Sequence, residues 1–272
     1  MRRIDWIKIG IAAAVALGCI GIPRALAQDS DASASAPATS SSRNLASTSA
    51  GASLMETGIL PKAMQLYRQS VRELHQGHAV PAENDALRAL HVDGKFADAA
   101  ALAATAALKQ QQFQRASTEA AQAIEINSAD EKAWVILATA DNYLGEFSNA
   151  ADALGHVTLQ DRGTWQVAYQ WARVEAGRQN PQQCLQWSNR AALSAPPTFA
   201  PLHLLRTSVF LAAGEPALAA DQLEIYLQLP DVSSSQRGPL TQELHRLRKL
   251  SQQRSDSSPA AADPELSTSA AN

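Results

Sequence analysis

The sequence predicts an all-α fold, in which antiparallel helix hairpins stack into a right-handed solenoid. A small or apolar residue recurs in similar surroundings, at spacings of 34, 35 and 34 residues: Ala116, Ala150, Leu185 and Ala219. A period near 34 residues is typical of a helix-turn-helix unit repeated along a chain. No segment of the sequence shows the sustained alternation of apolar and polar residues, bounded by hairpin turns, that predicts a strand.

The first 27 residues have the pattern of a signal peptide. Basic residues at positions 2, 3 and 8 precede an apolar run over 9–22, which is shorter than the about 20 residues that span a bilayer. Small residues before Gln28 offer a cleavage site, so we expect cleavage between Ala27 and Gln28 and a mature chain that is periplasmic or secreted. Two alternatives stay open: an uncleaved anchor facing the periplasm, and lipidation of Cys19.

Removal of this segment takes the formal net charge from −3 to −6, because four basic residues and one acidic residue lie in it. A mildly acidic chain lacks the clustered Lys and Arg that nucleic acids or anionic membrane surfaces require, so we expect neither as a partner. Cys184 would be the only cysteine left, which excludes an internal disulfide. Its position on a predicted helix predicts burial as a small apolar residue.

The two ends of the chain differ in composition from its middle. Residues 28–57 and 253–272 are rich in Ser and Ala, with scattered Pro and Asp and few large apolar side chains. Such segments bury too little apolar surface to offset the entropy lost on ordering. We therefore expect a disordered linker and a disordered tail around a helical solenoid over 58–252.

The helical block is predicted to open with an irregular hairpin. Apolar residues from Leu60 to Leu74 recur at steps of three and four after Pro61, and Gly77 follows, as expected for a helix with proline in its first turn and glycine after its end. A shorter helix is predicted over 82–92.

Four clear units are then predicted over 97–130, 131–165, 166–199 and 200–233. The motif Ser128-Ala-Asp-Glu131 matches a capping box, so a helix is expected to begin there. Pro239 is expected to open a last helix over 239–252, whose leucine stripe and basic flank suit a cap that closes the solenoid.

These units resemble the tetratricopeptide repeat (TPR) family over roughly residues 97–230. The second unit matches best, through Trp134, Leu137, Ala138, Gly145, Ala150, Leu154 and Val157. The first unit keeps Ala116, Ala120 and Ala123, and the fourth keeps Gly214, Ala219 and Leu223. Two positions depart from the family pattern: Gln111 stands where glycine is usual, and Leu185 where a small residue is usual.

The resemblance implies that the first helices of successive units line a concave groove, which holds a peptide or a partner helix. The inward positions that it implies are Lys109, Lys132, Val135, Thr139, Asn142, Tyr143, Gln170, Trp171, Arg178 and Leu205. Aromatic residues beside hydrogen-bond donors favour a partner with some acidic character. In the alternative interpretation, Trp171 and Val174 pack between neighbouring helices. Lys132 and Asn142 do not have the spacing with which some members of the family grip a C-terminal carboxylate.

The sequence predicts no enzyme, no metal and no cofactor. His75 and His78 flank a helix-breaking glycine without further ligands nearby, and Cys184 has no histidine close in sequence. We therefore expect a protein interaction scaffold or assembly factor of the bacterial cell envelope, whose partner the sequence does not identify. Two alternatives are an accessory subunit or module of an envelope enzyme complex, and a self-associating structural protein.

Overall fold

The computed structural model describes residues 58–157, 164–230 and 232–257. Within these ranges every regular element is a helix, which confirms the predicted all-α class. The expected signal peptide, with Cys19, Ala27 and Gln28, and the expected linker lie outside them, as does the tail beyond residue 257.

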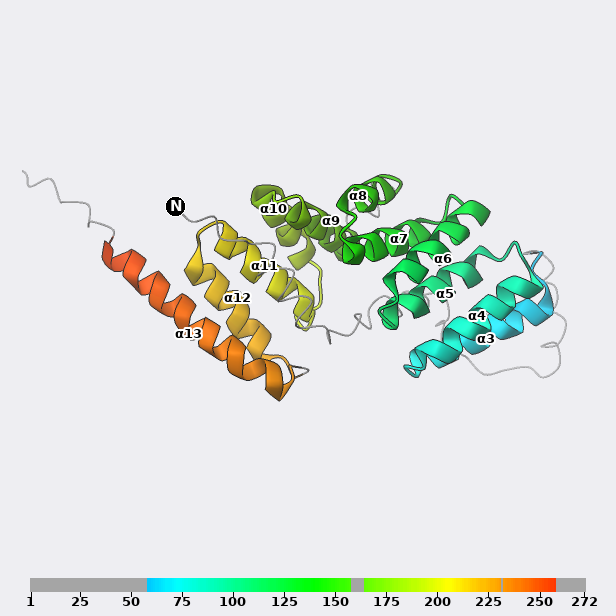
Figure 1. Cartoon of the computed structure of the whole chain (residues 1–272), viewed down its shortest axis with the longest axis horizontal. Coiled ribbons are helices and arrows are strands. Elements are labelled where there is room, and N and C mark those ends of the chain that lie inside the picture. The colour runs from blue at the N-terminus through cyan, green and yellow to red at the C-terminus, as the bar shows by residue number, and fades with distance from the viewer. Residues whose placement is uncertain (1–57, 158–163, 231, 258–272) are drawn as a thin grey trace, which may run out of the picture.

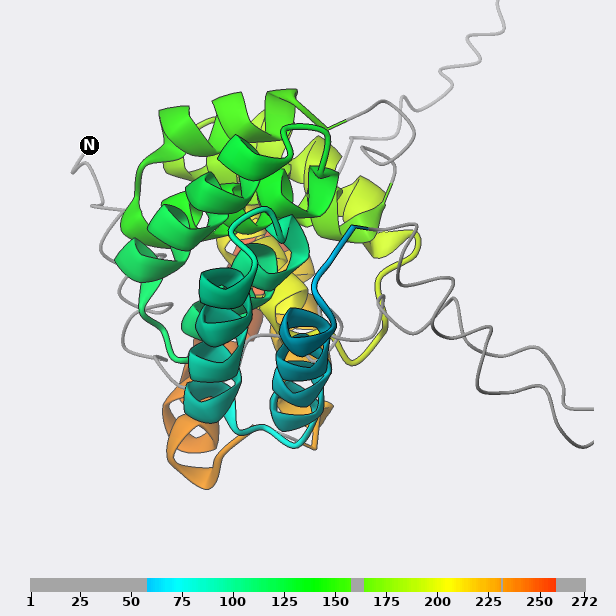
Figure 2. The ribbon, with the colours of Figure 1, turned by 90° about the vertical axis from the view of Figure 1, so that its right-hand side faces the viewer.

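Each helix packs against its neighbour in the chain. The helices are α3 (Pro61–His75), α4 (Ala79–Val92), α5 (Ala97–Lys109), α6 (Phe113–Ile126), α7 (Glu131–Leu144), α8 (Phe147–Gly155), α9 (Trp165–Gly177), α10 (Pro181–Ala192), α11 (Ala200–Ala212), α12 (Pro216–Gln228) and α13 (Ser234–Ser257). Figure 1 shows the hairpins stacked into an arch, with α3 and α4 towards one end and α13 at the other. In Figure 2 both ends lie below the middle hairpins, which shows the curvature of the predicted solenoid.

The second helices of five hairpins bury the same three positions. The first position is small in every hairpin: Ala82, Ala116, Ala150, Cys184 and Ala219. The positions four and seven residues later are buried as well: Ala86, Ala120, Leu154, Ser188, Leu223, then Ala89, Ala123, Val157, Ala191 and Tyr226, of which Val157 lies just after the end of α8. The hairpin α3/α4, expected to be irregular, therefore shares the register of the others.

The third predicted unit is displaced by one residue from the sequence prediction. Cys184, not Leu185, occupies the buried position: Cys184 is 0% exposed and packs in a cluster with Ala172 and Val209, whereas Leu185 is half-buried. The expected burial of Cys184 is thus confirmed. One residue rotates a helix by about 100° because a turn holds about 3.6 residues, so every position assigned in that unit moves to another face.

Each hairpin turns through one residue in the left-handed conformation. Three of these residues are glycines, Gly77, Gly145 and Gly214, with φ of 87°, 79° and 77°. At the same repeat position stand Gln111 and Gln179, with φ of 61° and 59°. This conformation costs side chains other than glycine about 1–2 kcal/mol, so these two turns carry backbone strain.

Two helix starts differ from the prediction. The capping box at Ser128 does not form: Asp130 is the N-cap of α7 and accepts from the Lys132 N–H at 3.0 Å. The Ser128 carbonyl instead accepts a hydrogen bond from the Trp134 indole at 2.9 Å, which holds Ser128 outside the helix.

The last helix, α13, begins at Ser234 rather than at Pro239, and it continues to Ser257, so residues 253–257, expected to open the disordered tail, are helical. The Arg237 guanidinium donates to the carbonyls of Leu227 and Leu229 at the end of α12. These contacts hold the first turns of α13 in place although Pro239 donates no backbone hydrogen bond.

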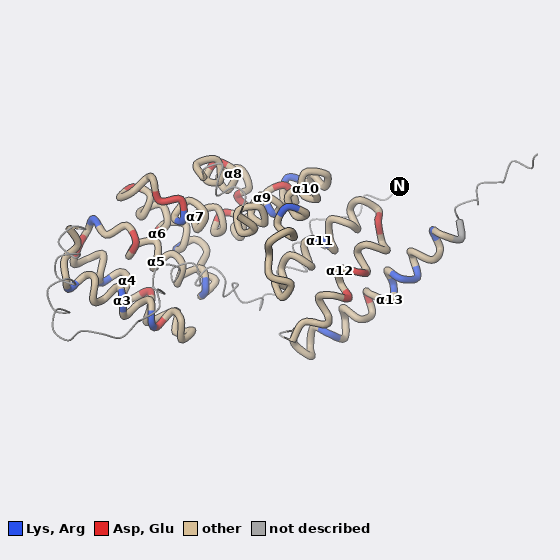
Figure 3. Tube along the Cα trace, turned by 180° about the vertical axis from the view of Figure 1, so that it is seen from behind, with Lys and Arg blue, Asp and Glu red and all other residues tan. Residues whose placement is uncertain are grey.

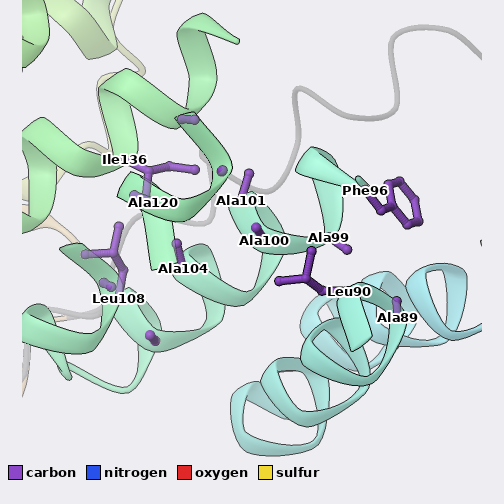
Figure 4. Packing of buried hydrophobic residues seen from close by; sticks show 14 of the residues in the cluster. Ala89, Leu90, Phe96, Ala99, Ala100, Ala101, Ala104, Leu108, Ala120 and Ile136 are labelled. Atoms are coloured by element: carbon purple, nitrogen blue, oxygen red, sulfur yellow. The ribbon is translucent and has the colours of Figure 1, made fainter. Parts of the chain in front are cut away.

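The core consists largely of alanine, which lets helices approach closely. Figure 4 shows Ala100, Ala104 and Leu108 along α5, with Ala120 of α6 and Ile136 of α7 beside them. The first four of these side chains are 0% exposed. Such dense packing fixes the relative positions of neighbouring hairpins and therefore the positions of the side chains on their surface.

Candidate partner-binding surface

Three of the ten predicted groove residues, on α7 and α9, are buried. Thr139, Asn142 and Gln170 are 3%, 4% and 6% exposed. The Asn142 amide donates to the backbone and side-chain oxygens of Gln170 at 3.3 and 3.0 Å, and the Thr139 hydroxyl donates to the Val135 carbonyl at 2.7 Å. Asn142 and Gln170 thus join two successive first helices, whereas Thr139 bonds within α7, so these side chains position the surface rather than form it.

Three more predicted residues are half-buried in apolar clusters. The Trp171 ring stacks on Trp187 of α10, with ring centres 5.6 Å apart. Val135 packs in the same cluster as Trp171, and Leu205 packs in the cluster of Cys184. Trp171 thus packs between helices, as in the alternative interpretation of the sequence, and Val174 is fully buried.

The remaining four predicted residues are at least partly exposed. Lys132 and Arg178 are exposed, Tyr143 is 39% exposed and Lys109 is half-buried. The Arg178 guanidinium lies 3.7 Å from a Glu175 carboxylate oxygen, and the Lys109 ammonium lies 3.5 Å from the Leu74 carbonyl. Contact of these side chains with a partner stays a prediction.

In the corrected register, Arg173 occupies the position that Thr139 has one unit earlier, and Arg173 is not among the predicted groove residues. The Arg173 guanidinium carbon lies 3.9 Å from the centre of the Tyr143 ring. Phe113 stacks against the same ring, with centres 4.4 Å apart and planes at 6°. We call Phe113, Tyr143 and Arg173 the Tyr143 stack; it links α6, α7 and α9. If Cys184 is taken as the small residue of its unit, the sequence predicts that Arg173 lies at the same position as Thr139.

The charge of Arg173 has no partner of opposite sign in the part of the chain that the structure describes. No carboxylate there lies within ion-pair distance of it, and its Nη1 is buried without an acceptor. An unsatisfied buried donor costs about 1–3 kcal/mol. Nearby, burial raises the pKa of the Tyr169 hydroxyl well above its ordinary value, although Arg173 lowers it in part. The stack is therefore a cationic and aromatic site that lacks an anion.

Charge is unevenly spread over the two halves of the arch. Figure 3 shows several basic residues along α13 at one end of the molecule. Arg248 of this helix pairs with Asp221 at 3.1 Å and with Glu224 at 2.5 Å. These ion pairs tie the cap to α12, as expected for a helix that closes a solenoid.

Comparison with known proteins bears on the fold. No protein-family model and no curated protein matches this sequence. A thermophilic TPR protein of Thermus thermophilus matches with a TM-score of 0.55 and 16% identity, covering 67% of this chain and 99% of that one. A tetratricopeptide repeat protein of Parabacteroides merdae matches with a TM-score of 0.53 and 15% identity, covering 76% and 78%. YrrB, a TPR protein with an unusual peptide-binding site, matches with a TM-score of 0.51 and 12% identity, covering 74% and 98%.

The chain has the tetratricopeptide repeat fold. Together with the 34-residue register, these similarities confirm the resemblance that the sequence suggested. In the described part of this TPR solenoid, no three His, Cys, Asp or Glu side chains are grouped so that they could hold a metal ion. Over the same residues, no helix combines the length and the hydropathy that a membrane span needs.

Proposed function

We propose that this TPR solenoid is a protein interaction scaffold that binds a peptide or a partner helix of acidic character along its first helices. The observation that carries this proposal is the Tyr143 stack, in which an arginine without a carboxylate partner lies on a partly exposed tyrosine. Arg and Tyr are enriched, together with Trp, among the side chains that contribute most of the binding energy at protein interfaces. A carboxylate of the partner would supply the charge that Arg173 lacks.

The rigidity of the surface supports the proposal. Asn142 and Gln170 hold α7 against α9, and Phe113 fixes one side of the Tyr143 ring. A surface that is ordered before the partner arrives loses less entropy on binding.

The cellular setting is also part of the proposal. The sequence pattern of residues 1–27 supports export, cleavage before Gln28 and action in the periplasm as an assembly factor of the cell envelope. An accessory role in an envelope enzyme complex and self-association are the alternatives. Size-exclusion chromatography with light scattering tests the second of them directly.

The test compares partners captured from envelope extract by the wild type and by three variants. Tyr143→Ala and Arg173→Gln should each lose the same partner. Arg190→Gln is the matched control, because the Arg190 guanidinium also lies over an aromatic ring, 5.5 Å from the centre of Trp187 on the second helix α10. Titration of the identified partner should then show binding weakened about tenfold or more by either variant, which is about 1.4 kcal/mol. Retention of every partner by Tyr143→Ala and Arg173→Gln would refute the proposal.

A further inference from the structure

A second surface feature lies at hairpin α7/α8, on a different face of α7 from Tyr143. A cavity of about 320 Å³ opens between α6, α7 and α8. Trp134 and Leu137 give it an apolar wall, and the carboxylates of Asp141, Glu146 and Asp152 line it as well. Trp134, Leu137 and Asp141 follow each other at steps of three and four, on a different face of α7 from Thr139 and Asn142. The cavity is therefore separate from the proposed first-helix surface.

The aromatic wall of the cavity is held in place. The Trp134 ring stacks on His156, with centres 3.9 Å apart and planes at 13°. The Trp134 indole N–H donates to the Ser128 carbonyl at 2.9 Å, which fixes the ring at its other end. Electron-rich indole rings attract cations, and the planar guanidinium group stacks well on such surfaces.

Asp141 is buried beside this wall without a cation. It is 3% exposed, and its Oδ1 accepts a hydrogen bond from the Ser117 hydroxyl at 3.1 Å. Within the described ranges, no Lys or Arg pairs with Asp141, Glu146 or Asp152. Burial raises the pKa of Asp141, and the charge of Glu146 raises it further, while Ser117 lowers it. A buried carboxylate without a counter-ion is unfavourable.

In two other units, the acidic residue at the repeat position of Asp141 has the ion-pair partner that Asp141 lacks. Glu73, two units earlier, pairs with His78 at 2.8 Å. Glu175, one unit later, lies 3.7 Å from the Arg178 guanidinium and accepts from the Asn180 amide at 3.1 Å. Asp141 is thus the acidic residue of this position that forms no ion pair within the described residues, and it lines a cavity.

We propose that this cavity binds an arginine side chain of a partner protein. The guanidinium would stack on the Trp134–His156 wall and donate to the carboxylates of Asp141 and Asp152. The cavity volume lies at the lower end of the about 300–1,000 Å³ that is usual for small-ligand sites, so it suits one long side chain rather than a folded segment. Arginine fits better than lysine, because it offers a planar face and several donors at once.

The test titrates the purified protein with the capped tripeptide acetyl-Gly-Arg-Gly-amide, following the indole N–H signal of Trp134 by NMR. Two matched peptides carry citrulline or lysine instead of arginine. The arginine peptide should bind with a dissociation constant on the order of 1 mM, and the citrulline peptide at least tenfold more weakly. Equal binding of the arginine and citrulline peptides, or no shift of the Trp134 signal, would overturn the proposal. Equal binding of the lysine peptide would overturn the choice of arginine.

Two variants separate binding from folding. Asp141→Asn should weaken binding of the arginine peptide at least tenfold. Glu175→Gln, at the equivalent position one unit later, should leave binding of this peptide unchanged. The melting temperature of Asp141→Asn should equal or exceed that of the wild type, because the variant removes an uncompensated buried charge. Equal effects of both variants on binding would overturn the proposal. Tyr143→Ala and Arg173→Gln test the first-helix surface, so failure of either proposal can be told apart from failure of the other.

Discussion

A buried carboxyl group between α4 and α6 should make the stability of the solenoid depend on pH. Glu119 is 7% exposed, and its Oε2 is buried without a partner. It lies close to Glu83, which is 3% exposed and already accepts from Arg115 at 2.8 Å and from the Gln110 amide. Burial, together with the charge of Glu83, raises the pKa of Glu119 from 4.5 to about 7, and Arg115 offsets this only in part.

The sign of the effect follows from this pKa. The folded protein holds the Glu119 proton more tightly than the unfolded chain does, so the free energy of unfolding falls as the pH rises from about 4.5 to about 7 and then levels off. Each pH unit between the two pKa values changes the free energy by about 1.4 kcal/mol. The loss therefore has an upper bound of about 3 kcal/mol, and relaxation of the site reduces it towards about 1–2 kcal/mol.

Urea denaturation of the wild type and of Glu119→Gln, from pH 5 to pH 8.5, tests this reasoning. The glutamine variant should be more stable than the wild type at pH 8, by about 1–2 kcal/mol, and the difference should shrink towards pH 5. The control is Glu125→Gln, an exposed glutamate on the same helix. A difference between Glu119→Gln and the wild type that does not change with pH would refute the assignment, since titration of other groups cancels in that comparison.

Three further predictions concern the hairpin turns and the core. Gln179→Gly should raise the free energy of unfolding by about 1 kcal/mol in urea denaturation, because it relieves a left-handed glutamine; no gain would show that its surroundings compensate the strain. Gly177→Ala should cost about 1–3 kcal/mol, because a Cβ there would lie 2.3 Å from the Phe147 ring. In a Phe147→Ala background the same change should no longer destabilise, and an unchanged cost would disprove the contact. The Cys184 thiol should resist iodoacetamide at pH 8 until the protein unfolds, since burial raises its pKa to about 12; rapid labelling of the folded protein would contradict this.

The fold was predictable because its main signal is repeated. Small residues at Ala116, Ala150 and Ala219 recur with one period, and one misread position does not change that period. Helix ends were less predictable, because they depend on contacts that no local pattern shows. Ser128 fits a capping box in sequence, but the Trp134 indole binds its carbonyl and Asp130 caps the helix instead.

The candidate site was predicted only in part, since predicting a binding surface requires that the exposed face of every helix be assigned correctly. With Leu185 instead of Cys184 as the repeat position, Trp171 and Arg178 were predicted to line the groove and Arg173 was not. Tyr143 lies in a unit whose register was read correctly, and the structure places it in the stack with Phe113 and Arg173. The cavity beside Asp141 joins side chains of three helices, and its unpaired charge is recognisable only by comparison with Glu73 and Glu175 in space.

The alternation of glycine and glutamine at the hairpin turns has a consequence for how the array comes apart. Hairpins α3/α4, α7/α8 and α11/α12 turn on glycine, whereas α5/α6 and α9/α10 turn on glutamine. In a linear array each hairpin contributes its own stability plus that of its interfaces with its neighbours. The two glutamine turns therefore each carry a backbone strain of about 1–2 kcal/mol that the glycine turns lack. Opening that starts at α9/α10 would separate the Arg173 side of the surface from the Tyr143 side, so release of a partner and local unfolding would share a first step.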